Sequence, residues 1–205
     1  MECTTQILGR RAASENRAAF CAHDPFTLVI FGASGDLAQR KLIPALFHLE
    51  LDGYLPEKYC VVGFSRSELG DAAYRESMTK ALEDEGPASP ARSKLLESLF
   101  YVSGDNADAA SFTRLEQRLQ ELERERGLPG NRVYYLSVAP EFFATIVQQL
   151  ANTRMIRRRT DATWSRVIIE KPFGRDLESA RTLNQRVTEH LDETQAYRID
   201  HYLGK

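Results

Sequence analysis

Short apolar runs alternate with stretches of helical periodicity along almost the whole sequence, and this alternation constrains the fold more than any other feature. The first run, Phe26–Phe31, is apolar apart from Thr27 and ends at Gly32. Such a run is typical of a strand buried on both faces of a parallel sheet. Comparable runs follow at residues 59–63, 100–102, 133–138, 167–169 and 196–199.

Between these runs, apolar residues recur every three to four positions, as on one face of a helix. Two stripes are expected, with Leu42, Ala45, Leu46 and Leu49 in the first, and Phe112, Leu115, Leu119 and Leu122 in the second. Further helices are expected near residues 72–85, 141–152 and 177–191. Strands that alternate with helices predict an α/β fold, with a Rossmann-type doubly wound, mostly parallel sheet and helices on both of its faces.

The segments outside this pattern carry weaker signals. Residues 1–24 are polar and aperiodic, which predicts a disordered tail before a domain over residues 25–200. Residues 86–91 predict a plain surface loop. In residues 114–126 the charges alternate in sign, which predicts a solvated helix face over a buried stripe. Residues 157–159 are three arginines that we expect to be exposed.

Charge and composition exclude several classes of protein. Lys and Arg total 27 against 29 Asp and Glu, so no basic surface for nucleic acid or for a membrane is expected. No apolar run approaches the roughly 18 residues of a membrane-spanning helix, and the first residues do not resemble a secretory signal. Three widely spaced cysteines exclude a disulfide scaffold and a structural zinc site. We therefore expect a cytoplasmic protein that binds no metal.

A glycine-containing loop, Gly32-Ala-Ser-Gly35-Asp-Leu-Ala38, follows the first run at the position where a Rossmann fold binds phosphate. Gly32 suits a tight turn, Gly35 lets backbone amides approach a pyrophosphate, and Ala38 suits close helix packing. The spacing departs from the usual G-x-G-x-x-G, and an ordinary strand–turn–helix is the alternative. Pro44 predicts that a first helical turn near Asp36 is followed by a restart around Leu42 or Ile43.

The second run leads into Gly63-Phe-Ser-Arg66-Ser, with no acidic residue before Glu68. An enzyme that prefers NAD usually carries Asp or Glu at this place for the ribose hydroxyls. Arg66 can instead hold a 2′-phosphate, and Ser65 or Ser67 can donate hydrogen bonds to it. This favours NADP, although an ordinary surface arginine is the alternative.

The last two runs are also followed by polar residues. Lys171 and Pro172 fall at the carboxyl end of a strand, where open α/β sheets bind their ligands. After residue 199 come Asp200, His201, Tyr202 and Lys205. Donors from His, Tyr and Lys could form a phosphate pocket, and an aspartate could orient a catalytic imidazole. A polar chain end without chemistry is the alternative.

Four blocks together resemble the glucose-6-phosphate dehydrogenase family. They are the glycine loop with Lys41, the segment around Arg66, Glu170-Lys-Pro-Phe-Gly174, and Arg198-Ile-Asp-His-Tyr-Leu-Gly-Lys205. The last two are highly specific to this family. The resemblance implies oxidation of glucose 6-phosphate to 6-phosphoglucono-δ-lactone, with hydride transfer to NADP. It also implies a homodimer or homotetramer for the full-length protein.

The resemblance also implies roles for individual residues. Coenzyme contacts are expected from Gly32, Ala33, Ser34, Gly35, Asp36, Leu37, Ala38, Gln39, Arg66, Gly104, Asp105 and Lys171. Glucose 6-phosphate contacts are expected from Lys171, His201, Tyr202 and Lys205, and catalytic roles from Asp200, Lys171 and Lys41. Asp200 would pair with the family's general-base histidine, and Pro172 would be its cis proline. Gln39 departs from the family, in which many members carry a basic residue at that position.

Length is the larger departure, because family members run to several hundred residues and place the base histidine beyond the last block. The resemblance therefore implies an amino-terminal part, inactive alone, in which residues 201–205 begin a substrate and dimerisation domain. A non-catalytic NADP-binding module, such as a redox sensor, is the alternative. A short-chain reductase is a third reading, which would need its Tyr-x-x-x-Lys pair on a helix. Tyr54 and Lys58 have this spacing, but Gly53 and Pro56 place them in a turn.

Overall fold

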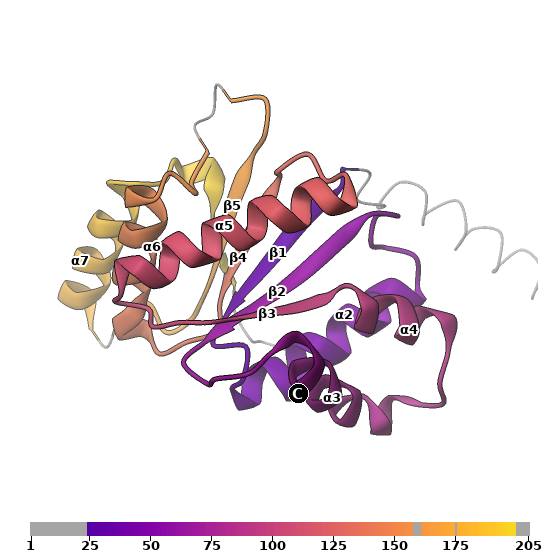
Figure 1. The fold of residues 1–205 in the computed structure, drawn as a ribbon. Coiled ribbons are helices and arrows are strands. Elements are labelled where there is room, and N and C mark those ends of the chain that lie inside the picture. Colours follow the sequence, from indigo (N-terminus) through magenta and orange to yellow (C-terminus); the bar gives the residue numbers. More distant parts are fainter. Residues whose placement is uncertain (1–23, 158–160, 175, 200–205) are drawn as a thin grey trace, which may run out of the picture.

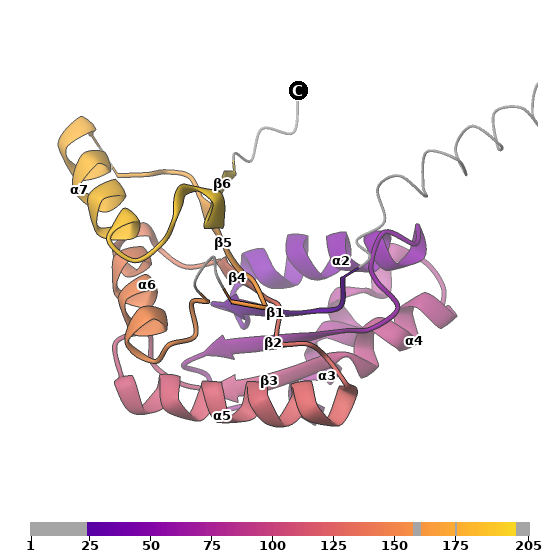
Figure 2. The same cartoon turned by 90° about the horizontal axis from the view of Figure 1, so that it is seen from above.

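A computed structural model describes residues 24–157, 161–174 and 176–199 (Figures 1 and 2). Its centre is a sheet of six parallel strands in the order β3-β2-β1-β4-β5-β6. The strands are β1 (Phe26–Phe31), β2 (Tyr59–Ser65), β3 (Leu99–Ser103), β4 (Arg132–Leu136), β5 (Ser165–Glu170) and β6 (Ala196–Ile199). This is the strand order of the doubly wound dinucleotide-binding fold, so the predicted fold class is confirmed.

Helices cover both faces of the sheet (Figure 2). One face carries α2 (Ile43–Leu51), α3 (Asp71–Ala81) and α4 (Pro90–Glu97); the other carries α5 (Ala109–Arg126), α6 (Phe143–Asn152) and α7 (Leu177–Thr188). Four short helical turns complete the order: η1 (Ala38–Leu42), η2 (Glu83–Glu85), η3 (Pro140–Phe142) and η4 (Glu193–Gln195). Along β1, Val29 and Phe31 pack on the α5 side, whereas Leu28 and Ile30 pack on the α2 side. Burial on both faces explains why this strand is apolar at nearly every position.

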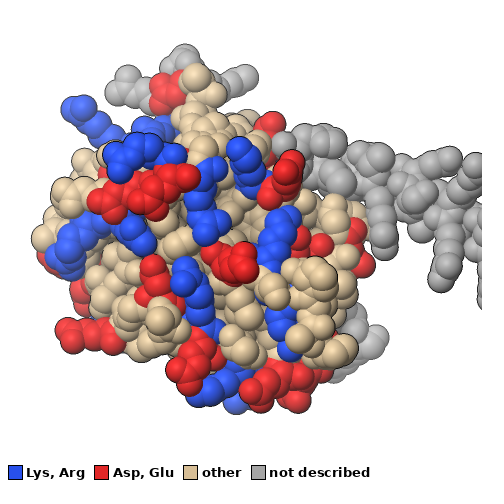
Figure 3. Space-filling view, turned by 45° about the vertical axis from the view of Figure 1, so that its right-hand side comes forward, with Lys and Arg blue, Asp and Glu red and all other residues tan. Residues whose placement is uncertain are grey.

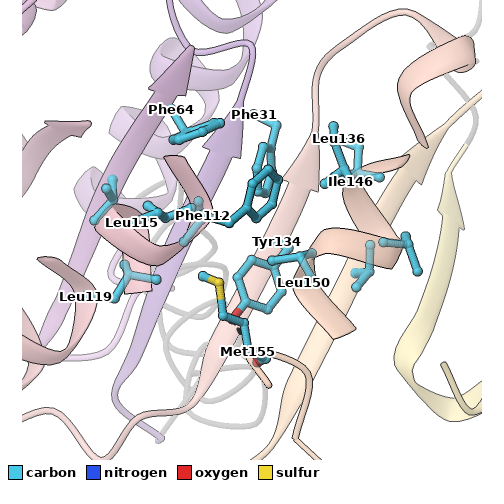
Figure 4. Close-up of a cluster of buried hydrophobic side chains, with 14 of the residues drawn as sticks. Phe31, Phe64, Phe112, Leu115, Leu119, Tyr134, Leu136, Ile146, Leu150 and Met155 are labelled. Carbon is cyan, nitrogen blue, oxygen red and sulfur yellow. Dashed lines mark hydrogen bonds between the residues drawn. The ribbon is translucent and has the colours of Figure 1, made fainter. Parts of the chain in front are cut away.

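The core on the α5 side is built from aromatic and branched side chains (Figure 4). Phe112 of α5 lies against Phe31 and Phe64, with ring centroids 5.8 and 5.5 Å away. Tyr134 of β4 is fully buried, and its hydroxyl donates to the carbonyl oxygen of Met155 at 2.9 Å. Burial raises the pKa of Tyr134 to about 12. The hydrogen bond from Tyr134 to Met155 ties the chain after α6 to the middle of the sheet.

A buried ion network joins α5 to the amino end of β4. Arg132 is fully buried, and its guanidinium donates to both carboxylate oxygens of Glu123, at 2.7 and 2.8 Å, and to Glu116. Burial disfavours the charge of Arg132, but the hydrogen bonds to Glu123 and Glu116 and the attraction of the surrounding charges together outweigh it, so the pKa of Arg132 is raised. The prediction of a solvated face over residues 114–126 is therefore wrong for Glu116 and Glu123, while the buried stripe of α5 is confirmed.

Three further expectations need correction. The stripe of Leu42, Ala45, Leu46 and Leu49 is only partly correct, because Leu42 and Leu46 pack against the core while Ala45 is exposed and Leu49 is 40% exposed. The fully buried residues of α2 are instead Ile43, Pro44 and Phe47. The loop at 86–91 ends early, because the Ser89 side chain accepts from the amide of Arg92 and starts α4 at Pro90. Finally, β4 ends at Leu136, so residues 137 and 138 lie outside the strand.

The predicted interruption before Pro44 is confirmed, and it takes the form of a wide turn. Residues 36 and 37 are helical, η1 is a π-helical turn, and α2 begins at Ile43 with Pro44 in its first turn. The amide of Ile43 bonds the carbonyl oxygen of Ala38, five residues earlier. A helix interior cannot accommodate a proline ring against the carbonyl four residues before it, and the wider turn relieves this clash.

Charge is mixed over the surface. On the face drawn in Figure 3, acidic and basic side chains alternate and neither sign gathers into a patch. Among the helices in the described ranges, none is long and apolar enough to cross a membrane. The described residues also hold no group of three or more His, Cys, Asp or Glu side chains arranged to bind a metal ion.

Removing the buried charge of Arg132 should destabilise the domain strongly. In Arg132→Met, Glu123 is left buried without a partner, and we expect the free energy of unfolding to fall by about 3–5 kcal/mol. Urea denaturation followed by circular dichroism measures this change.

Two control variants distinguish the loss of the ion-pair partner of Glu123 from the loss of side-chain packing at position 132. Replacing Glu123 as well, in Arg132→Met/Glu123→Met, should restore most of the loss, because no buried charge then lacks a partner. Lys80→Met breaks the exposed ion pair with Glu76 and should leave stability almost unchanged. A double variant as unstable as Arg132→Met would show that packing, and not charge, dominates.

Candidate functional site

A cleft opens at the centre of the sheet, at the carboxyl ends of β1 and β4. These neighbouring strands lead to helices on opposite faces, and ligands of open α/β sheets bind where the chain separates in this way. The cleft has a volume of about 600 Å³. It is lined by Gly32, Ser34, Gly35, Ser65, Arg66, Ser67, Asp105, Asn106, Ser137, Val138, Ala139 and Phe142.

Gly32 brings the main chain of the glycine loop against β4. Its φ of +81° lies in the left-handed region, and a Cβ at this position would lie only 2.1 Å from the carbonyl oxygen of Ser137. The amide of Gly32 donates to the carbonyl oxygen of Phe64 at 2.8 Å, which ties the loop to β2 as well. Only glycine fits this approach, so the expected tight turn at Gly32 is confirmed.

The loop presents backbone amides at the start of a helix. Gly35 donates to the carbonyl oxygen of Gly32 at 2.9 Å, and the chain is helical from Asp36. Among the described residues, none accepts a hydrogen bond from the amides of Ser34 or Asp36. Free amides at a helix start, together with the positive end of the helix dipole, favour an anion such as a pyrophosphate.

Other residues of the loop hold it in shape. Ala33 and Ala38 are fully buried, backbone included, so neither residue is open to a ligand. The amide of Ala33 donates to the carbonyl oxygen of Phe64 at 3.4 Å. The side-chain amide of Gln39 donates to the carbonyl oxygen of Ser34 at 3.1 Å, and Asp36 forms an exposed ion pair with Arg40 at 2.5 Å. Gln39 therefore supports the loop from within it.

The loop after β2 lies beside the glycine loop. The Ser34 hydroxyl is 2.8 Å from that of Ser65 and 3.0 Å from that of Ser67. Between them, Arg66 is exposed and lines the cleft, and none of the described carboxylates pairs with its guanidinium. Among the described residues that line the cleft, Arg66 is the only cation and Asp105 the only acid.

The ends of β3 and β4 complete the cleft. Gly104 packs against the ring of Phe64, where a Cβ would lie 2.5 Å from a ring carbon, while Asp105 lines the cleft. Two lining atoms, Asn106 Oδ1 and Ser137 Oγ, are buried without a hydrogen-bond partner among the described residues. Unpaired buried polar atoms are rare, and a bound polar ligand would satisfy them. This cleft therefore fits a dinucleotide.

Sequence reasoning missed five residues that line the cleft: Asn106, Ser137, Val138, Ala139 and Phe142. All of them follow the carboxyl ends of β3 or β4, and that position was the available signal. The apolar run 133–138 concealed it, because Val138 reads as a continuation of the strand.

The end of β5 holds the second predicted group. The Lys171–Pro172 peptide is cis, as expected, and Lys171 is exposed, with its amide donating to the carbonyl oxygen of Ile199 at 3.3 Å. The preceding Glu170 is buried and accepts a hydrogen bond from Tyr135 of β4. Burial, together with this carboxylate, raises the pKa of Tyr135. Pro172 lines a second hollow of about 670 Å³, between the start of α6 and α7.

Of the remaining predicted residues that the structure describes, Lys41, Tyr54 and Lys58 do not line the cleft. Lys41 is exposed on η1 and is not among the lining residues. Asp200, His201, Tyr202 and Lys205 lie outside the described residues. Tyr54 and Lys58 lie in the turn between α2 and β2, so their spacing carries no reductase chemistry.

Comparisons with known proteins agree on one family. The family profile "Glucose-6-phosphate dehydrogenase, NAD binding domain" matches residues 29–205. Glucose-6-phosphate 1-dehydrogenase of Chlamydia pneumoniae is 41% identical over 186 residues, which are 88% of this chain and 36% of that protein. Glucose-6-phosphate 1-dehydrogenase 2 of Mycobacterium tuberculosis (strain H37Rv) is 40% identical over 185 residues, with the same coverage of 88% and 36%.

Solved structures give the same result. A glucose-6-phosphate dehydrogenase in complex with its substrate glucose 6-phosphate superposes with a TM-score of 0.77 and 31% identity, over 89% of this chain and 38% of that one. Glucose-6-phosphate 1-dehydrogenase from Mycobacterium avium superposes with a TM-score of 0.74 and 33% identity, over 88% and 37%. The chain thus spans little more than a third of the length of these relatives.

Adding a single methyl group at Gly32 should close the cleft. In Gly32→Ala, the Cβ meets the Ser137 carbonyl and the backbone stays in the left-handed region. We expect the loop to move, dinucleotide binding to be lost, and the free energy of unfolding to fall by at least about 1–3 kcal/mol. Calorimetric titration and urea denaturation measure the two effects.

Gly53→Ala is the matched control. Gly53 also has a positive φ, of +72°, but a Cβ there would meet no atom within 4 Å. This variant should lose only the conformational part of the stability, about 1–2 kcal/mol, and bind as the wild type does. Equal binding by Gly32→Ala and the wild type would show that the close approach to Ser137 does not shape the site.

Proposed function

Because the chain belongs to the glucose-6-phosphate dehydrogenase family, we propose that it forms the coenzyme-binding domain of an enzyme that oxidises glucose 6-phosphate to 6-phosphoglucono-δ-lactone with NADP. This proposal rests on one observation, that the glycine loop and the residues around Arg66 lie side by side in one cleft. The backbone amides of the glycine loop can bind a pyrophosphate, and the Arg66 guanidinium, which pairs with none of the described carboxylates, can bind a further phosphate.

Different residues of the cleft bind different parts of the coenzyme. The amides of Ser34 and Asp36 bind the pyrophosphate at the helix start. Arg66 binds the 2′-phosphate through its fork of N–H groups, and Ser67 beside it can donate from its hydroxyl. Ser137 and Asn106 offer the unpaired polar atoms of the opposite wall. When bound, NADP accepts the hydride of the substrate.

We propose that glucose 6-phosphate binds near the carboxyl end of β5. Lys171 stands there beside Pro172, close in sequence to the buried Glu170. We assign to Lys171 the contact with both coenzyme and sugar, to His201, Tyr202 and Lys205 the sugar phosphate, and to Asp200 the orientation of a general-base histidine. Glucose 6-phosphate as substrate, the cytoplasm as location, and a homodimer or homotetramer as assembly belong to the same proposal.

The variant Arg66→Ala tests whether the cleft recognises the 2′-phosphate of NADP. Loss of a charged hydrogen bond to the 2′-phosphate should weaken NADP⁺ binding by about 1.5–3 kcal/mol and leave NAD⁺ binding unchanged. Calorimetric titration of each coenzyme measures the two affinities.

Arg124→Ala removes the same charge from the far end of α5, at the amino edge of the sheet, and should change neither affinity. Equal losses for NADP⁺ and NAD⁺ in Arg66→Ala would assign Arg66 to the fold of its loop instead of to the 2′-phosphate.

Lys171→Gln tests the substrate side in the active enzyme that contains this chain. Loss of a cation at the reacting centre should lower kcat/KM for glucose 6-phosphate about tenfold or more, the scale of one charged hydrogen bond. Lys58→Gln, an exposed lysine before β2, is the control. The rise of NADPH absorbance measures both, and an unchanged kcat/KM in Lys171→Gln would remove Lys171 from the site.

A further inference from the structure

Beneath the Arg66 loop, here defined as residues Ser65, Arg66 and Ser67, lies a buried tyrosine to which the function above assigns no role. Tyr101 of β3 is 6% exposed. Its hydroxyl oxygen lies 2.6 Å from Ser65 Oγ and 2.8 Å from the carbonyl oxygen of Ser67, so it contacts both residues that flank Arg66.

The ring of Tyr101 is held in place independently of its hydroxyl. It packs against Tyr74 of α3 with ring centroids 5.0 Å apart. Gly63 of β2 makes room for both rings, because a Cβ there would lie 2.9 Å from Tyr74 Cζ and 3.0 Å from Tyr101 Cδ2. The amide of Tyr101 donates to Asp71 Oδ1 at 2.8 Å. Removing the hydroxyl should therefore leave the ring where it is.

The direction of each hydrogen bond follows from counting protons. A phenol has one proton, and two carbonyl oxygens that can only accept lie near it, that of Ser67 at 2.8 Å and that of Ser65 at 3.3 Å, so Tyr101 donates mainly to the nearer carbonyl, that of Ser67. The hydroxyl of Ser65 then donates to Tyr101, and Ser65 can accept in turn from Ser34 of the glycine loop. Ser103 also donates to the carbonyl oxygen of Ser67, at 3.1 Å. Two hydroxyls of β3 thus hold the backbone directly after Arg66.

We propose that Tyr101 is a positioning residue for coenzyme selectivity, which holds the Arg66 loop so that the guanidinium faces the 2′-phosphate of NADP; this rests on the function proposed above. Arg66 itself has no partner among the described residues, so its direction depends on the backbone that carries it. Holding that backbone in advance lowers the entropy lost when the phosphate binds.

The effect is selective because the pyrophosphate cradle is anchored elsewhere. Gly32 and Ala33 donate to the carbonyl oxygen of Phe64, at 2.8 and 3.4 Å, and Gly32 also packs on Ser137. None of these contacts involves Tyr101, and the Ser34 and Ser65 hydroxyls, 2.8 Å apart, can keep their own hydrogen bond when the phenol hydroxyl is removed. A coenzyme without the 2′-phosphate gains nothing from the position of Arg66, so its binding is insensitive to the Tyr101 hydroxyl.

Tyr101→Phe tests the inference, with NADP⁺ and NAD⁺ each titrated calorimetrically into the 205-residue chain. Loss of one buried hydrogen bond should weaken NADP⁺ binding roughly 3- to 15-fold and leave NAD⁺ binding unchanged. Tyr134→Phe is the matched control, because it also removes a tyrosine hydroxyl from a backbone carbonyl, that of Met155 in the core. It should lower stability without changing either affinity.

Ser103→Ala provides a second, independent variant, since it removes the other donor to the Ser67 carbonyl from a partly exposed position. Ser103→Ala should also weaken NADP⁺ binding but not NAD⁺ binding, with a smaller loss of affinity than Tyr101→Phe. If Tyr101→Phe does not fold, Ser103→Ala alone tests whether the hydroxyls of β3 position the Arg66 loop. Equal losses for the two coenzymes, or no loss in a folded variant, would overturn the inference.

The wild-type titration separates this inference from the proposed function. A wild type that binds NADP⁺ no better than NAD⁺ overturns the NADP assignment, and the role of Tyr101 with it. A wild type that prefers NADP⁺, loses the preference in Arg66→Ala and keeps it in Tyr101→Phe and Ser103→Ala overturns the role of Tyr101 alone.

Discussion

The candidate site depends on the close approach of the Gly32 backbone to the backbone carbonyl of Ser137. It brings the turn after β1 against the end of β4, where the chain has just changed from one face of the sheet to the other. Because no side chain fits between the two, the glycine loop lies against β4, and Gly32, Ser34 and Gly35 line the cleft. The positions of Ser34 and of the Arg66 loop follow from that turn through the serine hydroxyls.

The two ends of the sheet are held by different interactions. At the amino end, the charge of Arg132 is enclosed by Glu116 and Glu123, so its guanidinium is not open to a ligand. At the carboxyl end, hydroxyls and amides hold the loops, and the Arg66 guanidinium has no partner among the described residues. Strong, enclosed ion pairs suit a permanent junction between helix and sheet, whereas a ligand site needs charges that are unpaired until the ligand arrives.

Much of this arrangement could be predicted from the sequence, for reasons that differ by residue. Phe26–Phe31 is apolar apart from Thr27 because both of its faces are buried, and Arg66 stands out because no acid occupies the end of β2. The errors share another cause, since a residue type does not reveal its partner. Glu123 looks like any exposed helical acid until Arg132 is placed beneath it. In α2, apolar residues occur on every side, so the spacing alone could not select Ile43 and Phe47 as the buried pair.

The chemistry of the cleft walls has a consequence for acidity. Serine hydroxyls, backbone amides and a guanidinium do not change their protonation near neutral pH, and no histidine lines the cleft among the described residues. The single carboxylate there, on Asp105, already accepts a hydrogen bond from the amide of Ala107. A phosphate monoester, by contrast, gains a proton near pH 6. In that range the phosphate of the ligand therefore changes its charge, and the described lining of the cleft holds no imidazole to titrate with it.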